Sequence, residues 1–266
     1  FWVVNTYDSN HDMRVAAGLG MAAVALNRHD RYRWWKPETW WHRPAGWLKK
    51  ADRSLSPTRR RSDLLYQGST GAYAEGSTYY HYAADLYLPF FFAHENFQRG
   101  GGTRFLRADV TTDLALWSLD LRLPDGRRAQ VDNARLFHDS TPGYFLSRLG
   151  GGVRSAADRD LLLWDFAQSG FPGIGGRRAS FLLSAFDPTD AELSAALASP
   201  GPGLQPTRYM PQRGGAVLRT GWGPDAAHVL VQAQQGKVRK RGKGHESVAN
   251  GAFAFFAHGD QVTIDP

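Results

Sequence analysis

Hydrophobic positions recur with a helical period along roughly the first 195 residues. The run 10–28 opens at Ser9 and Asn10, which are residue types that cap helix N-termini, and continues as an Ala- and Leu-rich segment. Its small residues predict close packing against another helix. Further helices are predicted, between Gly- and Pro-rich connections, at 79–97, 110–121, 157–168 and 190–198.

The segment 31–50 departs from this helical pattern. It holds five tryptophans among basic residues and two prolines, which predicts a loop and then a short helix with Trp47 and Leu48 facing inward. A basic loop at 56–63 follows. Exposed indoles stack on the C–H faces of sugars, so Trp34 and Trp35 are candidate substrate-binding residues; the alternative is that the tryptophans fill space between helices.

The pattern changes after residue 206. Short alternating or β-branched runs bounded by Gly and Pro predict antiparallel strands, and these runs are 214–222, 228–235, 251–259 and 260–266. We therefore expect an α+β protein with a helical domain at 1–198, a linker at 199–206 and the start of a sheet domain at 207–266.

Composition restricts the chemistry. The 266 residues carry a net charge of +7 and no cysteine, so the surface should attract polyanions, and disulfides, thiolate zinc sites and cysteine nucleophiles are excluded. No apolar run reaches the ~18 residues of a membrane span. The chain begins at Phe1 without a methionine and stops just after a strand-like run, so we expect a segment of a longer chain.

Three segments carry a family resemblance: 9–26 (SNHDMRVAAGLGMAAVAL), 71–88 (GAYAEGSTYYHYAADLYL) and 239–266 (RKRGKGHESVANGAFAFFAHGDQVTIDP). Together with 123–133 (LPDGRRAQVDN), they resemble the heparinase II/III-type polysaccharide lyases in content and order. The resemblance implies an incomplete α/α toroid followed by an antiparallel β-sandwich. It also implies a secreted or periplasmic enzyme that acts on an anionic polysaccharide containing uronic acid.

Such a lyase removes the C5 proton of a uronic acid and expels the 4-linked sugar, so the carboxylate must be neutralised, the proton taken and the leaving oxygen protonated. Asn10 and His11 lie at a predicted helix N-terminus, which favours an anion, and they suit the neutralising role. The alternative is that Asn10 merely caps the helix and His11 is solvated.

The resemblance assigns the proton transfers to a tyrosine and a histidine. A phenolate stabilised in a cationic cleft can accept the C5 proton, and the resulting phenol can donate a proton to the leaving oxygen. Among the tyrosines, the resemblance favours Tyr80, which directly precedes His81. The alternative is that these tyrosines form a packing stripe, and Tyr87 is expected to be structural. His245 follows a glycine ahead of a Phe-rich strand and is expected to act as the base or to hold the carboxylate.

The remaining candidates are substrate-binding residues. The positive charges of Arg239 and Arg241 suit the binding of acidic sugar groups. The alternative is that these two residues belong to a run of charges that only water contacts. Position in the resembling segments adds Arg14, Glu75, Tyr79 and Glu246.

A structural metal is not expected. Many relatives place a second His two residues after the first and an Asp soon afterwards, whereas this chain has Ser247 and Ala249, and only Asp265 fits the later acid. We expect no metal and no other cofactor.

Two other classes of function remain open. A glycoside hydrolase on an α/α toroid needs paired carboxylates, for which Glu38, Glu75 and Asp85 are candidates that form no convincing pair. A binding module for anionic chains without catalysis fits the basic run near residue 240, and no nucleic-acid motif is present. The oligomeric state and the identity of the polysaccharide stay undetermined.

Overall fold

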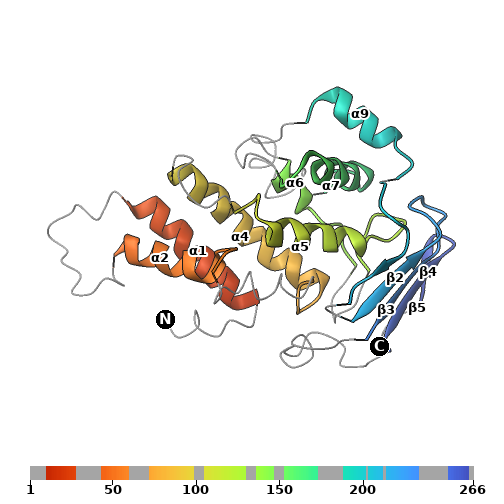
Figure 1. The fold of residues 1–266 in the computed structure, drawn as a ribbon, viewed down its shortest axis with the longest axis horizontal. Coiled ribbons are helices and arrows are strands. Elements are labelled where there is room, and N and C mark those ends of the chain that lie inside the picture. The colour runs from red at the N-terminus through yellow and green to blue at the C-terminus, as the bar shows by residue number, and fades with distance from the viewer. Residues whose placement is uncertain are drawn as a thin grey trace.

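The computed structural model describes residues 10–27, 43–59, 72–98, 105–129, 136–146, 153–172, 188–201, 203–211, 214–233 and 251–263. These residues form helices followed by an antiparallel sheet, so the chain is an α+β protein (Figure 1). The helices are α1 (Asn10–Leu26), α2 (Pro44–Leu55), α4 (Ser77–Phe97), α5 (Asp109–Asp120), α6 (Pro142–Phe145), α7 (Ala156–Gln168) and α9 (Asp190–Ala198). The strands are β1 (Arg208–Tyr209), β2 (Gly215–Arg219), β3 (His228–Gln232), β4 (Phe253–Ala257) and β5 (Asp260–Thr263).

Local signals explain where the helices begin. Ser155 caps α7 by accepting a hydrogen bond from the Asp158 amide, and Thr189 and Glu192 form a capping box at α9. All five predicted long helices are present, with ends that differ from the prediction by at most two residues. The four-residue helix α6 has no hydrophobic period long enough to reveal it, and the sequence did not predict it.

Close approach of two helices organises the N-terminal part. Helix α1 packs against both α2 and α4 (Figure 1). A Cβ atom placed on Gly20 would overlap the ring of Phe90, so only glycine allows α1 to come this close to α4. The close packing predicted from the small residues of the first helix is confirmed.

The sheet has the order β1-β2-β3-β4-β5, with every neighbouring pair antiparallel. Side chains alternate between two faces, as strand geometry requires. The inner face carries Val217, Leu230 and Phe256, which belong to the same buried cluster as the aromatic residues of the helices. The strands therefore share one hydrophobic core with the helical part. The domain division at 199–206 lies between α9 and β1 and stays a prediction.

The outer face of the sheet is also apolar. Leu218 and Phe253 are 44% and 53% exposed, and Val229, Val231 and Phe255 beside them are partly exposed. Cross-strand pairing joins these side chains into one patch. The structure thus leaves an apolar sheet surface without a covering layer among the described residues. None of the described helices has the length and apolar character that crossing a membrane requires.

Candidate functional site

The first turn of α1 lies against the turn that precedes α4. The Asn10 backbone N–H donates a hydrogen bond to Glu75 Oε2 over 2.5 Å, across 65 residues of sequence. Both residues are buried. The N-terminal ends of the two helices are therefore adjacent, and two of the three resembling segments meet there.

The turn before α4 has a backbone shape that favours glycine. Gly76 has φ 90° and ψ 176°, a region that is essentially restricted to glycine, and its N–H donates to the Tyr73 carbonyl over 3.2 Å. Tyr73 in turn donates its hydroxyl to Met13 Sδ on α1 over 3.5 Å. The turn is thus attached to α1 through both Tyr73 and Glu75.

The tyrosines of α4 differ strongly in exposure. Tyr80 is fully buried against the rings of Tyr73 and Trp117, whereas Tyr79 is half-buried and Tyr82 is 44% exposed. Burial and the Asp139 carboxylate raise the pKa of Tyr80, although Thr141, Tyr87 and Arg128 oppose the rise. The structure thus disfavours the Tyr80 phenolate, whereas the sequence led us to expect a stabilised one. Tyr87 lies in the core, as expected.

Arg14 connects α1 to the exposed side of α4. Its guanidinium lies 3.5 Å from the ring centre of Tyr82, a cation–π contact. Burial lowers the pKa of Arg14, and the charge of Asp85 opposes this shift. Arg14 is partly exposed. The α1–α4 surface near Asn10 therefore presents the stacked Arg14 and Tyr82 side chains to solvent.

His81 is a residue of this region that the sequence analysis did not select. Its Nε2 lies 2.9 Å from Ser140 Oγ, its Nδ1 lies 3.7 Å from Asp85 Oδ2, and its ring packs on Phe137 with centroids 4.9 Å apart. The position directly after Tyr80 was the only available signal. Its partners at 137–140 are distant in sequence and could not be predicted.

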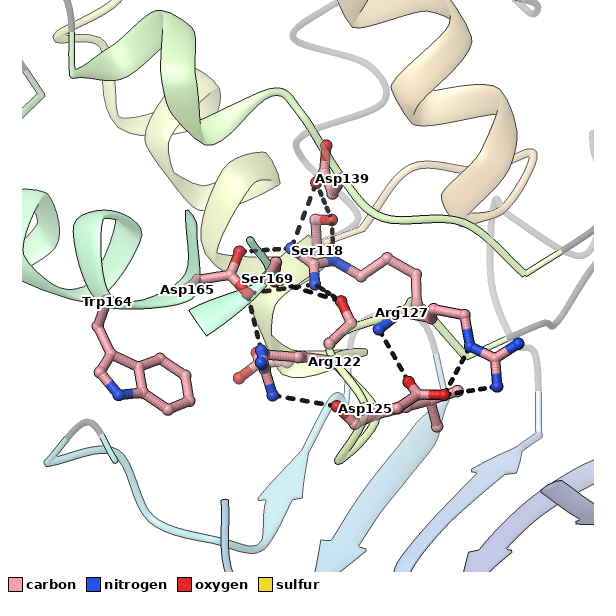
Figure 2. Close-up of polar contacts among 12 residues, drawn as sticks. Ser118, Arg122, Asp125, Arg127, Asp139, Trp164, Asp165 and Ser169 are labelled. Atoms are coloured by element: carbon pink, nitrogen blue, oxygen red, sulfur yellow. Dashed lines mark hydrogen bonds and ion pairs between the residues drawn. The ribbon is translucent and has the colours of Figure 1, made fainter. Parts of the chain in front are cut away.

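A buried polar network supports the loop that carries Ser140. Asp139 accepts hydrogen bonds from Ser118 Oγ and, at 2.8 Å, from the Thr141 amide. Ser118 also accepts from Arg128 Nε over 3.0 Å (Figure 2). Burial alone would raise the pKa of Asp139, but Arg128, His81 and these hydrogen bonds lower it instead. Asp139 is therefore a buried carboxylate held in its charged form.

The same network reaches α7. The two terminal nitrogens of Arg128 contact the two carboxylate oxygens of Asp165 at 3.2 and 2.5 Å, a bidentate ion pair, and Arg122 Nε lies 3.1 Å from Asp165 Oδ1 (Figure 2). Burial alone would lower the pKa of Arg128, but Asp165 and Asp139 outweigh it and raise that pKa. The network joins α5, α7 and the loop at 136–141.

At the junction with the sheet, charged groups are less well paired. Arg219 donates from Nη2 to the Asp120 carbonyl over 2.5 Å, and Arg208 Nε lies 3.3 Å from the Asp120 carboxylate. Burial raises the pKa of Asp120 to about 6, against the effect of both arginines. Burial and the Arg219 charge lower the pKa of His228 to about 3, and neither imidazole nitrogen has a hydrogen-bond partner among the described residues. His228 is thus buried and neutral.

The comparisons with known proteins agree with this architecture. No protein-family model and no curated protein matches the sequence. Among solved structures, a mutant of heparan sulfate lyase HepC from Pedobacter heparinus has a TM-score of 0.54 and 14% identity, over 94% of this chain and 31% of its own. A heparinase III has a TM-score of 0.52 and 16% identity, over 97% of this chain and 33% of its own. The chain has a heparinase-like fold.

The chain spans about a third of the length of these two proteins, and at 14–16% identity the likeness establishes the fold alone. The sequence resemblance to heparinases is thereby confirmed as a resemblance of fold. The activity and substrate named for those lyases belong to them, and for this chain both are proposals.

Several predicted site residues lie outside the described part of this heparinase-like chain. They are Trp34, Trp35, Arg239, Arg241, His245 and Glu246, together with Ser247, Ala249 and Asp265, on which the metal question depends. His11 is described and is exposed on the first turn of α1. Within the described ranges, no group of three or more His, Asp or Glu residues could hold a metal ion. The candidate site residues that the structure describes therefore lie at the N-terminal ends of α1 and α4.

Proposed function

We propose that this chain is a polysaccharide lyase that cleaves an anionic polysaccharide containing uronic acid by β-elimination. One observation carries the proposal: the heparinase-like fold brings the Asn10 and Glu75 segments into contact, although 65 residues separate them. These are two of the segments that resemble the lyase family in sequence. The net charge of +7 favours association with an anionic chain.

In the proposed reaction, the uronate carboxylate is neutralised at the first turns of α1. Arg14 is partly exposed and suits a charge-assisted hydrogen bond to that carboxylate, with the Asn10 amide and His11 on the same helix end. Neutralising the carboxylate makes the C5 proton more acidic, because the charge that develops on its removal is then stabilised. The resemblance assigns His245 to the proton transfer or to the carboxylate.

The tyrosine that completes the reaction must reach the sugar. The resemblance selects Tyr80, but its hydroxyl is buried and burial raises its pKa, so in this arrangement it stays protonated and covered. Tyr79 and Tyr82 occupy the same two turns of α4 with exposed surface. We therefore extend the proposal to these two rings, and the experiment below compares all three.

The finer architecture is also a proposal. An α/α toroid and a β-sandwich are what the resemblance implies for the helices and the sheet. The apolar outer face of β2, β3 and β4 supports a second sheet layer, because a sheet with two apolar faces is stable in water only when both are covered. A secreted or periplasmic location is inferred from the resemblance alone.

The decisive experiment measures unsaturated product on a panel of uronic-acid polysaccharides. β-Elimination creates a double bond conjugated to the carboxylate, which absorbs in the ultraviolet, whereas hydrolysis creates new reducing ends without that absorbance. Wild-type protein is compared with Tyr79→Phe, Tyr80→Phe, Tyr82→Phe and His245→Ala. Loss of product with one Phe variant and with His245→Ala identifies the reacting pair.

Other outcomes would replace the proposal. New reducing ends without ultraviolet absorbance would identify a glycoside hydrolase. Salt-sensitive binding to the polysaccharide without any product would identify a binding module. A wild-type activity that all four substitutions leave unchanged would show that the chemistry lies elsewhere on the chain.

A further inference from the structure

The contact between Glu75 and the first turn of α1 has an unusual chemical form. The first four N–H groups of a helix lack partners within the helix, and the N-terminal end carries partial positive charge. Glu75 places a carboxylate oxygen 2.5 Å from the backbone nitrogen of Asn10, and Glu75 is only 2% exposed. The position at which a helix N-terminus would bind an anion is thus already filled by a carboxylate of the protein.

This occupancy changes what Asn10 can contribute. Its backbone N–H is committed to Glu75, whereas its side-chain Oδ1 and Nδ2 are buried without hydrogen-bond partners in the described part of the chain. An unpaired buried amide is unfavourable unless another group satisfies it. Asn10 is itself 0% exposed, so its side-chain amide, and not the helix end, is the buried part of Asn10 that still has unused hydrogen-bonding capacity.

Glu75 also links Asn10 to the tyrosines. Gly76, which follows it, turns the chain with φ 90°, and its carbonyl accepts the Tyr80 N–H over 3.1 Å in the first turn of α4. A shift of Glu75 would move α1 and the start of α4 relative to one another. The carboxylate is a direct polar connection between the two helix starts.

We propose that Glu75 is a positioning residue. By binding the backbone N–H of Asn10, it fixes the Asn10 side-chain amide relative to the tyrosines of α4. From the sequence, Glu75 was expected to bind substrate, whereas its buried contact with Asn10 makes it part of the protein's own framework. This inference rests on the proposed lyase function as far as turnover is concerned, whereas the attachment of α1 does not depend on it.

Two conservative substitutions separate position from charge. Glu75→Gln keeps the length of the side chain and an acceptor oxygen but loses the charge, whereas Glu75→Asp keeps the charge but withdraws it by one methylene group. If Glu75 positions Asn10, the Gln variant keeps most of the activity and the Asp variant loses up to ~100-fold, as expected for a displacement of about 1 Å. The loss should appear in kcat more than in KM.

A double-mutant cycle tests whether the effect passes through Asn10. Glu75→Asp should reduce kcat/KM strongly in the wild type and have little further effect in an Asn10→Ala background, because the group it positions is already absent. Tyr73→Phe is the matched control, since it removes the hydrogen bond of the same turn to Met13 of α1 without changing the Asn10 contact. Tyr73→Phe should leave unchanged the ratio of kcat/KM between the Glu75→Asp and Glu75→Gln variants.

Hydrogen exchange of the first-turn amides of α1 gives a readout that needs no substrate. Exchange should accelerate in Glu75→Asp and stay near the wild-type rate in Glu75→Gln and Tyr73→Phe. Unchanged exchange in Glu75→Asp would overturn the positioning role even if no polysaccharide is cleaved. Greater activity in the Asp variant than in the Gln variant would overturn it too, in favour of direct contact between the charge and substrate. Absence of unsaturated product from wild type, with the exchange pattern as expected, would reject only the lyase proposal.

Discussion

Replacing Asp165 with asparagine should destabilise the protein more than any exposed charge substitution. Asp165 is 1% exposed and is paired with Arg128 at 2.5 and 3.2 Å and with Arg122 at 3.1 Å. An asparagine side chain has nearly the same shape as aspartate, so packing is preserved while both guanidinium groups lose their common counter-charge. Figure 2 shows the Asp165 side chain projecting from α7 toward Arg122.

The expected loss follows from the burial of the partners. Arg128 and Arg122 are 1% and 4% exposed, so neither can regain water without local unfolding. Removing one member of a buried ion pair typically costs about 3–5 kcal/mol, because an uncompensated charge remains inside the protein, and here two charges share the deleted partner. We therefore expect about 4 kcal/mol for Asp165→Asn. Asp139 stays 3.7 Å from Arg128 and limits the loss.

Urea unfolding at neutral pH, followed by circular dichroism, measures this difference, provided that the slope against denaturant is unchanged. Asp113→Asn is the matched control. Asp113 pairs with Arg154 at 2.9 Å, but the two side chains are 49% and 34% exposed, so we expect about 0–1 kcal/mol. A loss below about 1 kcal/mol for Asp165→Asn would refute the reasoning, because it would mean that water reaches the network.

Three further predictions concern pH and glycine. The His228→Leu variant should gain stability relative to wild type, by on the order of 4 kcal/mol, as pH falls from about 6.5 toward 3. In wild type the imidazole binds a proton in the unfolded state over this range, whereas burial keeps it unprotonated in the folded state, so wild type loses stability. Unfolding curves of both proteins across that pH range test this. Gly76→Ala should lose about 1–3 kcal/mol in urea unfolding, because φ 90° with ψ 176° is strained for alanine. Gly20→Ala should lose about 1–3 kcal/mol of stability, because the new Cβ atom would overlap the Phe90 ring. Gly18→Ala should instead gain up to about 1 kcal/mol from helix propensity, because no atom lies near its Cβ position. Equal effects of the two substitutions in thermal unfolding would contradict the packing argument.

The helices and strands were largely predictable because their signals are local. The capping sequence before residue 190 and the alternation at 214–219 both specify an element within a few residues. The start of α4 was placed two residues late, because the turn at Gly76 depends on backbone geometry that the hydrophobic period does not show. The sequence therefore predicted the elements better than the turns between them.

The environment of the candidate site was much less predictable. Tyr80 was chosen from its neighbour in sequence, but its burial depends on Trp117, which lies on another helix. The role of Glu75 likewise depends on a contact across 65 residues. Arg128 and Asp165, which look like ordinary surface charges in sequence, are buried because they pair with one another. Sequence patterns report which side chains are present, whereas exposure and pKa depend on partners that only the fold brings close.

Wherever no second layer covers it, the apolar outer face of the sheet also governs whether molecules of the protein associate in solution. A net charge of +7 makes molecules repel one another at low ionic strength, and salt at about 0.1 M shortens the range of that repulsion to roughly 10 Å. Molecules can then approach closely enough for the faces around Leu218 and Phe253 to associate. Added salt thus weakens attraction to a polyanion while it promotes self-association, so light scattering must accompany any salt titration of polysaccharide binding.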